Sequence, residues 1–252
     1  MRKGWLGLRV HFALWLRVGC IVASLVQTPT HASLNRKAAV SAEVVSFETE
    51  LVAGELKIPV ITGLSDAELE RTLNAQWERE IKGFVDVIRA EAEAFHKEMG
   101  EEVRHWLPFQ AYVDFKIGYL DERFVSLPIV YYSYTGGAHG LSFQESANVD
   151  LAEGLNLTLE DLFVPGYDFC TVIQTEVKRQ RAANADWYFD ETMAETVILP
   201  HHPFYLTPQG VVVYFGLYEI APYSTGIPEF VIPYDYLWDG LKPEIRAIVE
   251  AE

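Results

Sequence analysis

Cysteine is nearly absent from this chain of 252 residues, which contains only Cys20 and Cys170. Once an N-terminal leader containing Cys20 is removed, one cysteine is left and no internal disulfide can form. The C-x-x-C spacing of zinc and redox sites does not occur. The G-x-S-x-G, H-E-x-x-H, P-loop and strand-associated G-x-G-x-x-G signatures are missing too. The sequence therefore offers no motif for the enzyme classes that these signatures mark, and it predicts no cofactor.

Positive charge is also scarce, since 20 Lys and Arg residues face 36 Asp and Glu residues, for a net charge of −16. The first 32 residues contain four basic residues and no acidic one. Without them, 16 basic residues oppose 36 acidic ones and the net charge becomes −20. Such a surface repels nucleic-acid phosphates and anionic lipids, and it attracts cationic partners. The same acidity also suits an exported protein that only needs to stay soluble.

Long apolar runs are missing apart from the N-terminal leader, residues 1–32. A basic start, the short apolar run 18–26 and small residues at Thr30 and Ala32 predict a secretory signal peptide cleaved after Ala32. An uncleaved anchor is the alternative, although Arg17 interrupts the run of about 20 apolar residues that a span requires. We therefore expect a secreted or periplasmic protein that contacts a membrane only if the leader is retained.

A long amphipathic helix is the clearest element. Ser65 followed by Glu68 predicts a capping box at its start. Apolar residues then recur every three or four positions, which indicates one buried helix face that ends near His96 or Met99. These residues are Leu69, Leu73, Trp77, Ile81, Phe84 and Ile88.

Strands are predicted before and after this helix. Residues 33–42 are small and polar, which predicts a flexible tether. Period-2 alternation of apolar residues predicts strands in 44–52 and 55–61. A meander of antiparallel strands follows, then a helical turn capped by Thr158, a second amphipathic helix, a hairpin, a last strand and short terminal helices. The meander covers 109–119, 124–134 and 141–149, the helical turn 157–163 and the second helix 167–184. The hairpin covers 204–206 and 211–217, the last strand 229–232, and the terminal helices 234–241 and 244–251. Clustered strands predict an α+β fold with largely antiparallel sheet.

Two stretches rich in tyrosine and glycine carry the candidate binding residues. The first is YYSYTGGAHG, residues 131–140, and the second is YEIAPYSTGIPEFVIPY, residues 218–234. Tyrosine offers a large, stiff surface with a polar tip, and proline reduces the freedom lost on binding. The predicted ligand-binding residues are Tyr134, His139, Tyr218, Glu219, Pro222 and Tyr223. Burial of the same rings in the core is the alternative.

A metal centre and paired-carboxylate catalysis are the competing interpretations. His139, His201 and His202 are the available nitrogen donors, and Asp150 or Glu219 can add oxygen. The histidines are scattered or adjacent, and adjacent residues of an extended strand point to opposite faces. Nothing singles out one carboxylate pair among 36 acidic residues. We therefore predict neither a catalytic residue nor a metal site.

The two stretches, together with LNLTLEDLF and LTPQGVVVYFG, resemble the RsiV-type domain, domain of unknown function 3298. The upstream PVITGLSDAELERTLNAQW resembles the module that precedes it in PdaC-type deacetylases, domain of unknown function 4163. The resemblance implies an N-terminal PdaC-type module over 43–145 and an RsiV-like module over 146–252. It also implies an extracytoplasmic location, because RsiV-like ectodomains sense lysozyme by binding it and the deacetylases carry their catalysis in a separate domain.

Three hypotheses follow from these features. The leading one is a non-catalytic binding module of the bacterial envelope that recognises lysozyme-like basic proteins or peptidoglycan. The second is an envelope hydrolase or metal-dependent enzyme, and the third is a structural module of an envelope assembly. Only 17 residues precede the apolar run and no deacetylase domain follows, so we expect neither an anti-sigma region nor a catalytic domain in this sequence.

Overall fold

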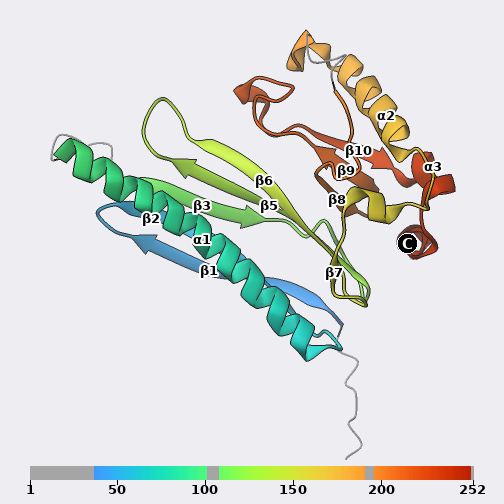
Figure 1. Cartoon of the computed structure of the whole chain (residues 1–252), viewed down its shortest axis with the longest axis horizontal. Coiled ribbons are helices and arrows are strands. Elements are labelled where there is room, and N and C mark those ends of the chain that lie inside the picture. The colour runs from blue at the N-terminus through green and yellow to red at the C-terminus, as the bar shows by residue number, and fades with distance from the viewer. Residues whose placement is uncertain (1–36, 101–107, 191–195, 251–252) are drawn as a thin grey trace, which may run out of the picture. The chain divides into compact units, whose positions relative to one another are not determined.

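A computed structural model describes residues 37–100, 108–190 and 196–250 (Figure 1). The predicted leader, residues 1–32, lies outside these ranges, as do residues 33–36 of the predicted tether. Within the described ranges the chain contains a larger and a smaller β-sheet with helices, so the α+β prediction is confirmed.

The larger sheet has the strand order β1-β2-β3-β5-β6-β7, with the short β4 paired to β5. All its pairs are antiparallel except β2 with β3. The meander β3-β5-β6 is therefore confirmed. The strands are β1 (Ala39–Glu48), β2 (Val52–Thr62), β3 (Phe109–Phe115), β4 (Tyr119–Leu120), β5 (Phe124–Tyr134), β6 (Leu141–Asp150) and β7 (Leu155–Asn156).

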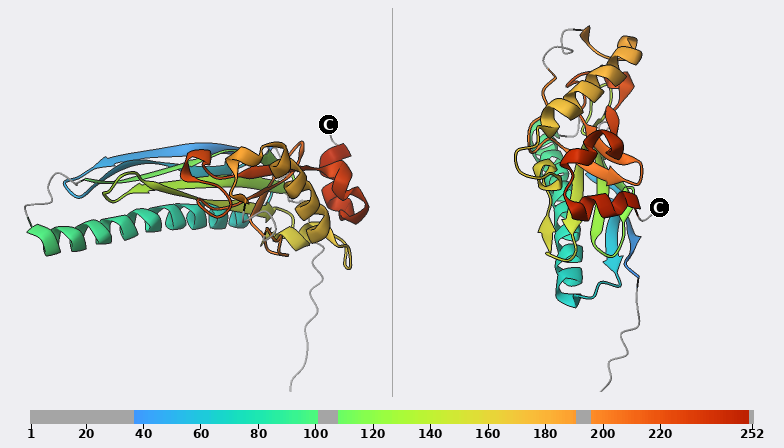
Figure 2. Two further views of the ribbon diagram at one scale, coloured as in Figure 1. Left: turned by 90° about the horizontal axis from the view of Figure 1, so that it is seen from above. Right: turned by 90° about the vertical axis from the view of Figure 1, so that its right-hand side faces the viewer.

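Helix α1 (Ala67–Met99) covers one face of this sheet (Figure 2). Its predicted apolar face is confirmed, because Leu73, Trp77, Ile81 and Ile88 are buried against the strands. Burial of these side chains is the main stabilising term for such a helix, since isolated helices gain little from propensity alone. The helix also connects the parallel strands β2 and β3, and such strands need a crossover of this kind.

The start of α1 differs from the prediction. The N-cap is Asp66, whose carboxylate accepts hydrogen bonds from the backbone N–H groups of Glu68 (2.8 Å) and Leu69 (3.0 Å). The predicted capping box of Ser65 with Glu68 is therefore wrong by one residue. A carboxylate can accept from two orphan N–H groups and also faces the positive end of the helix dipole, so Asp66 is the better cap.

Replacing Asp66 with alanine is expected to lower the free energy of unfolding by about 1 kcal/mol, because two N–H groups lose their acceptor. Ser65→Ala is the matched control and is expected to change it by less than about 0.5 kcal/mol. Urea unfolding followed by far-UV circular dichroism measures both. A larger loss for Ser65→Ala than for Asp66→Ala would contradict the assignment of the cap.

The smaller sheet has the order β10-β9-β8 and is antiparallel throughout. Its apolar residues form a second core with α2 and the C-terminal helices. The helical turn at residues 159–162 is capped by Thr158 as predicted, and Asp161 accepts hydrogen bonds from the Thr158 backbone and hydroxyl. The elements are α2 (Phe169–Ala183), β8 (Phe204–Thr207), β9 (Gly210–Tyr214), β10 (Glu229–Pro233), α3 (Tyr234–Leu237) and α4 (Pro243–Glu250).

Two sequence-derived boundaries differ from the observed elements. Residues 39–42, predicted as part of the tether 33–42, lie in β1 and pair with β2 from Ala39 opposite Thr62. The division between the predicted modules 43–145 and 146–252 falls inside β6, which continues to Asp150. Over the described part of the chain, no helix combines the length and the apolar character that a membrane span demands.

Candidate functional site

Two loops distant in the sequence contact each other through their side chains. One is the hairpin loop 135–140 between β5 and β6, and the other is the loop 215–228 between β9 and β10. The His139 ring stacks on the Tyr223 ring with centroids 4.1 Å apart. The Tyr218 ring lies 5.9 Å from the same Tyr223 ring. We call these three side chains, with Tyr134, the aromatic loop surface.

Hydrogen bonds fix the rings of this surface. The Tyr223 hydroxyl donates to the Gly140 carbonyl oxygen at 3.0 Å, and His139 Nδ1 lies 2.9 Å from the same oxygen. A carbonyl only accepts, so Nδ1 donates this hydrogen bond, and the tautomer that carries its proton at Nδ1 has an acceptor lone pair at Nε2. The Tyr218 hydroxyl lies 3.3 Å from Nε2 and donates to it in that tautomer. The three rings and one carbonyl therefore form a connected network.

Glycines make the hairpin loop possible. Gly136 and Gly137 have φ of 99° and 95°, values that side chains with a Cβ rarely adopt. At Gly140 a Cβ would lie 2.4 Å from the Tyr132 ring and 2.5 Å from the Ser133 carbonyl oxygen. Tyr134 donates from its hydroxyl to the Gly137 carbonyl at 3.0 Å and so closes the loop on itself.

The second loop is anchored beneath its exposed tyrosine. Ile220 and Ala221 are buried, and the Ile220 carbonyl accepts a hydrogen bond from the Phe189 N–H at 3.0 Å. Tyr218 is 49% exposed and has φ of 65°, a left-handed conformation that is unusual for an aromatic residue. Strained residues of this kind persist where the surrounding structure fixes them, often at functional sites. The loop therefore holds an aromatic ring toward solvent at a conformational cost.

The six predicted ligand-binding residues divide into two groups. The structure brings His139, Tyr218 and Tyr223 into direct contact, and Tyr134 belongs to the same hairpin loop. Glu219 instead accepts a hydrogen bond from the Gly216 N–H at 2.7 Å, and Pro222 precedes the helical turn 223–225. Their contacts are local to the loop. The Gly140 carbonyl was missed, because its role depends on a ring 83 residues away.

The alternative metal donors are not gathered in one place. Within residues 37–100, 108–190 and 196–250, no group of three or more His, Cys, Asp or Glu side chains is arranged to hold a metal ion. His201 and His202 line a small pocket of about 160 Å³ that His139 does not line. Asp150 is buried and forms an ion pair with Arg123 at 3.1 Å.

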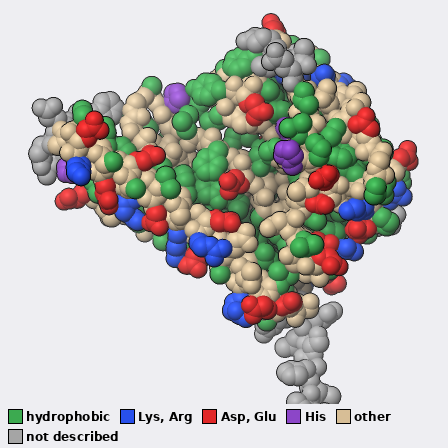
Figure 3. All heavy atoms as spheres, viewed as in Figure 1, with side chains coloured by type: hydrophobic (Ala, Val, Ile, Leu, Met, Phe, Trp, Pro, Cys, Tyr) green, Lys and Arg blue, Asp and Glu red, His purple; other side chains and the backbone are tan. Residues whose placement is uncertain are grey.

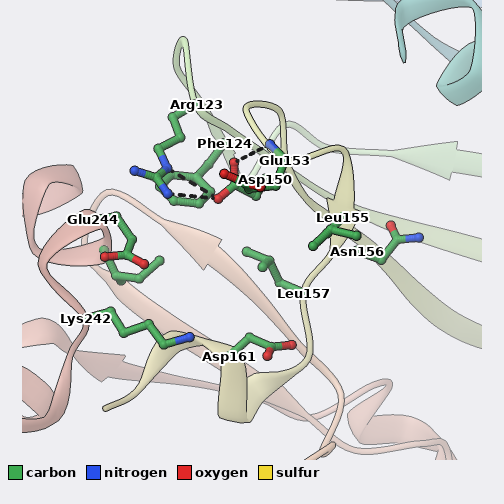
Figure 4. Close-up of a pocket in the computed structure, with 11 residues that line it drawn as sticks. Arg123, Phe124, Asp150, Glu153, Leu155, Asn156, Leu157, Asp161, Lys242 and Glu244 are labelled. Atoms are coloured by element: carbon green, nitrogen blue, oxygen red, sulfur yellow. Dashed lines mark hydrogen bonds and ion pairs between the residues drawn. The ribbon is translucent and has the colours of Figure 1, made fainter. Parts of the chain in front are cut away.

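A polar pocket of about 320 Å³ surrounds this ion pair (Figure 4). Arg123 and Asp150 point toward one another, and Lys242 and Asp161 lie on the opposite wall. Asp150 also accepts from the Ala152 N–H at 2.9 Å, so it supports a turn. The hydrogen bond from the Thr158 hydroxyl holds the pKa of Asp161 below its usual value, which keeps this carboxylate ionised. Both acids therefore have structural partners.

Comparison with known proteins relates the two loops to two families. Residues 45–142 match the model described as deacetylase PdaC, and residues 160–235 match the model of a protein of unknown function, DUF3298. The predicted resemblance and its order are thereby confirmed. His139 lies in the first matched segment, whereas Tyr218 and Tyr223 lie in the second. The aromatic loop surface is thus built jointly by the segments that match the two family models.

A curated relative and two solved structures are similar to this chain. Peptidoglycan-N-acetylmuramic acid deacetylase PdaC of Bacillus subtilis is 24% identical over 136 residues, which are 52% of this chain and 29% of that protein. A DUF3298 family member from Bacteroides fragilis has a TM-score of 0.64 at 19% identity, covering 86% of this chain and 99% of its own. One from Pseudomonas aeruginosa has a TM-score of 0.55 at 24% identity, covering 83% and 96%. The structures show that the fold is shared.

Proposed function

We propose that this chain is a non-catalytic binding module of the bacterial cell envelope, and that it docks lysozyme-like basic proteins through the aromatic loop surface. The main support for this proposal is the contact of His139 with Tyr218 and Tyr223, because this contact holds the rings in place before any partner binds. Rings that are already ordered lose little conformational freedom on binding. Tyrosine is also among the residues that most often dominate interface energies.

Charge supports a basic partner. The residues that follow the predicted leader have a net charge of −20, and opposite charges steer diffusional encounter. The matched PdaC and DUF3298 segments support a location in the cell envelope, because the name of the Bacillus subtilis relative describes an enzyme that acts on peptidoglycan. The chain spans 29% of that relative, so the deacetylase activity named there is not assigned to this chain.

Calorimetric titration with a c-type lysozyme tests the proposal. The leaderless protein is expected to bind at micromolar concentrations or tighter, and Tyr218→Ala is expected to weaken binding about tenfold, or about 1.4 kcal/mol. Tyr236→Ala is the matched control, since Tyr236 is 52% exposed and lies on α3, outside the aromatic loop surface.

Three outcomes are informative. Loss for Tyr218→Ala alone supports both the partner and the surface. Equal losses for both variants would reject the surface, and no binding by the unmodified protein would reject lysozyme-like partners.

Peptidoglycan is a second candidate ligand, favoured by the stacked His139 and Tyr223 rings and by the name of the Bacillus subtilis relative. Co-sedimentation with purified sacculi tests it. Pelleting that Tyr218→Ala abolishes would support glycan as the ligand, whereas protein that stays in the supernatant would exclude it.

A further inference from the structure

A groove between α1 and the β5–β6 hairpin adjoins the aromatic loop surface. Its volume is about 680 Å³, and it is lined by α1 residues between Glu80 and Glu91 and by strand residues between Tyr131 and Glu145. Thr135, the first residue of the loop that carries His139, and Leu141, which follows that loop, belong to the lining of the groove. Figure 3 shows hydrophobic side chains gathered around a hollow on this face, with acidic side chains near them.

The floor of the groove is aromatic. The rings of Phe84, Tyr131 and Phe143 form a triangle in which Tyr131 stacks on Phe143 at 4.7 Å and Phe84 meets both edge-on at 5.2 and 5.8 Å. Phe143 is nevertheless 45% exposed, and Leu141 and Val87 beside it are more than half exposed. Neighbouring apolar side chains left open to water in this way often mark a binding site.

Gly83 widens the groove. It lies in the middle of α1, where glycine costs about 1 kcal/mol relative to alanine. A Cβ built at Gly83 has no heavy atom within 4 Å, so no tight packing explains the glycine. The missing side chain instead leaves open space at Gly83, which lines the helix side of the groove.

The rim of the groove is acidic. Glu80 and Glu91 lie on the helix side and Glu145 on the strand side. No Lys or Arg lines the groove among the residues that the structure describes. Burial, and then the charge of Glu80, raise the pKa of Glu145, and no Lys or Arg among the described residues forms an ion pair with it. A cation brought by a partner would relieve that cost.

We propose that this groove receives a basic peptide segment of a protein partner, which inserts one large apolar side chain onto Phe84 and Phe143 and places flanking Lys or Arg residues against Glu80, Glu91 and Glu145. The apolar side chain is inferred from the exposed aromatic rings of the floor, and the positive charge is inferred from the carboxylates of the rim. The inference rests on the proposed function, because it specifies the chemistry of the partner, and it adds a contact area distinct from the aromatic loop surface.

The probe is a fluorescent twelve-residue peptide of lysine and serine with one central tryptophan. Two control peptides replace the tryptophan by serine or the lysines by glutamates. Fluorescence anisotropy with the leaderless protein is expected to show binding of the first peptide at least tenfold tighter than that of either control. Equal affinities for the tryptophan and serine peptides would show that the groove binds positive charge without recognising an apolar side chain, and would overturn the proposal.

Variants locate the peptide on the protein. Gly83→Trp fills the groove, and the triple change Glu80→Gln, Glu91→Gln, Glu145→Gln neutralises its rim; each is expected to weaken binding about tenfold. The charge-matched control is Glu48→Gln, Glu93→Gln, Glu98→Gln, at exposed positions outside the groove. It is expected to weaken binding less than twofold. Equal losses for both triple variants, or no loss for Gly83→Trp, would overturn the proposal.

The same variants separate the groove from the aromatic loop surface. Tyr218→Ala is expected to leave peptide affinity unchanged. Peptide binding without lysozyme binding would reject the proposed partner and keep the groove, whereas lysozyme binding that Gly83→Trp leaves intact would reject the groove alone. Self-association in sedimentation that Gly83→Trp abolishes would assign the groove to a second copy of this chain and overturn the proposal.

Discussion

Replacing Asn148 with alanine is expected to lower the free energy of unfolding by about 3 kcal/mol, although the change removes only a few atoms. Asn148 lies on β6 directly opposite Ser126 on β5, and both side chains are buried. The Asn148 carboxamide accepts from the Ser126 hydroxyl at 2.6 Å and donates to the Phe204 carbonyl at 2.8 Å. The Ser126 oxygen in turn accepts from the Leu206 N–H at 2.7 Å.

The size of this effect follows from the position of β8. It is an edge strand of the smaller sheet, so its outward backbone groups have no ladder partner within that sheet. Ser126 and Asn148 satisfy two of these groups and thereby attach β8 to the larger sheet. Each buried polar group left without a partner costs about 1 to 3 kcal/mol. Asn148→Ala deprives the Phe204 carbonyl and the Ser126 hydroxyl at once.

Urea unfolding at neutral pH measures the loss. Gln144→Ala is the control on the same strand, because Gln144 makes an exposed hydrogen bond to Glu229 at 3.1 Å. Its expected change is below about 0.5 kcal/mol. A loss for Asn148→Ala of similar size would show that water replaces these bonds and that the two sheets are held together by apolar packing.

Local patterns predicted most of the elements of this fold. The buried face of α1 is visible because Leu73, Trp77 and Ile81 recur at helical spacing. The strand 124–134 is found with its observed bounds, since turn residues border it on both sides. The parallel pairing of β2 with β3 was not predicted, because no local signal tells where a strand on the far side of a helix docks.

The candidate site divides in the same way. Tyrosine and glycine marked both loops, but their contact joins residues 79 and 84 positions apart in the sequence and depends on how the two sheets pack. The groove was missed for a different reason. Phe84 fits the buried face of a helix and Phe143 fits the alternation of a strand, so neither stands out as exposed. Gly83, an isolated glycine within a helical pattern, was the available signal.

Acidification is expected to destabilise the protein through His202. This ring is 8% exposed and lies 4.7 Å from the Phe215 ring, and its Nε2 is buried with no hydrogen-bond partner in the described structure. Burial is the main cause that lowers the pKa of His202 from 6.5 to about 4, and the neighbouring His201 lowers it further. The Tyr214 backbone opposes the shift.

The sign of the effect follows from where the proton binds. Above pH 6.5 the ring is neutral in both states and contributes no pH dependence. Between pH 6.5 and about 4 the His202 ring binds a proton in the unfolded chain but stays neutral in the folded protein, so the free energy of unfolding falls as the pH falls. One pKa unit corresponds to about 1.4 kcal/mol, and the full shift therefore costs about 3 kcal/mol by pH 4.

His202→Leu removes this titration and tests the argument, because leucine keeps an apolar contact with Phe215. Urea unfolding of both proteins between pH 7 and pH 4 is expected to show that the unmodified protein loses about 3 kcal/mol more than the variant. Carboxylates titrate in both proteins, so the difference isolates His202. His201→Ala, at an exposed ring, retains the burial of His202 and should keep most of the acid-induced loss. Parallel pH profiles for the unmodified protein and His202→Leu would mean that the His202 ring is hydrated in the folded protein and has the same pKa there as in the unfolded chain.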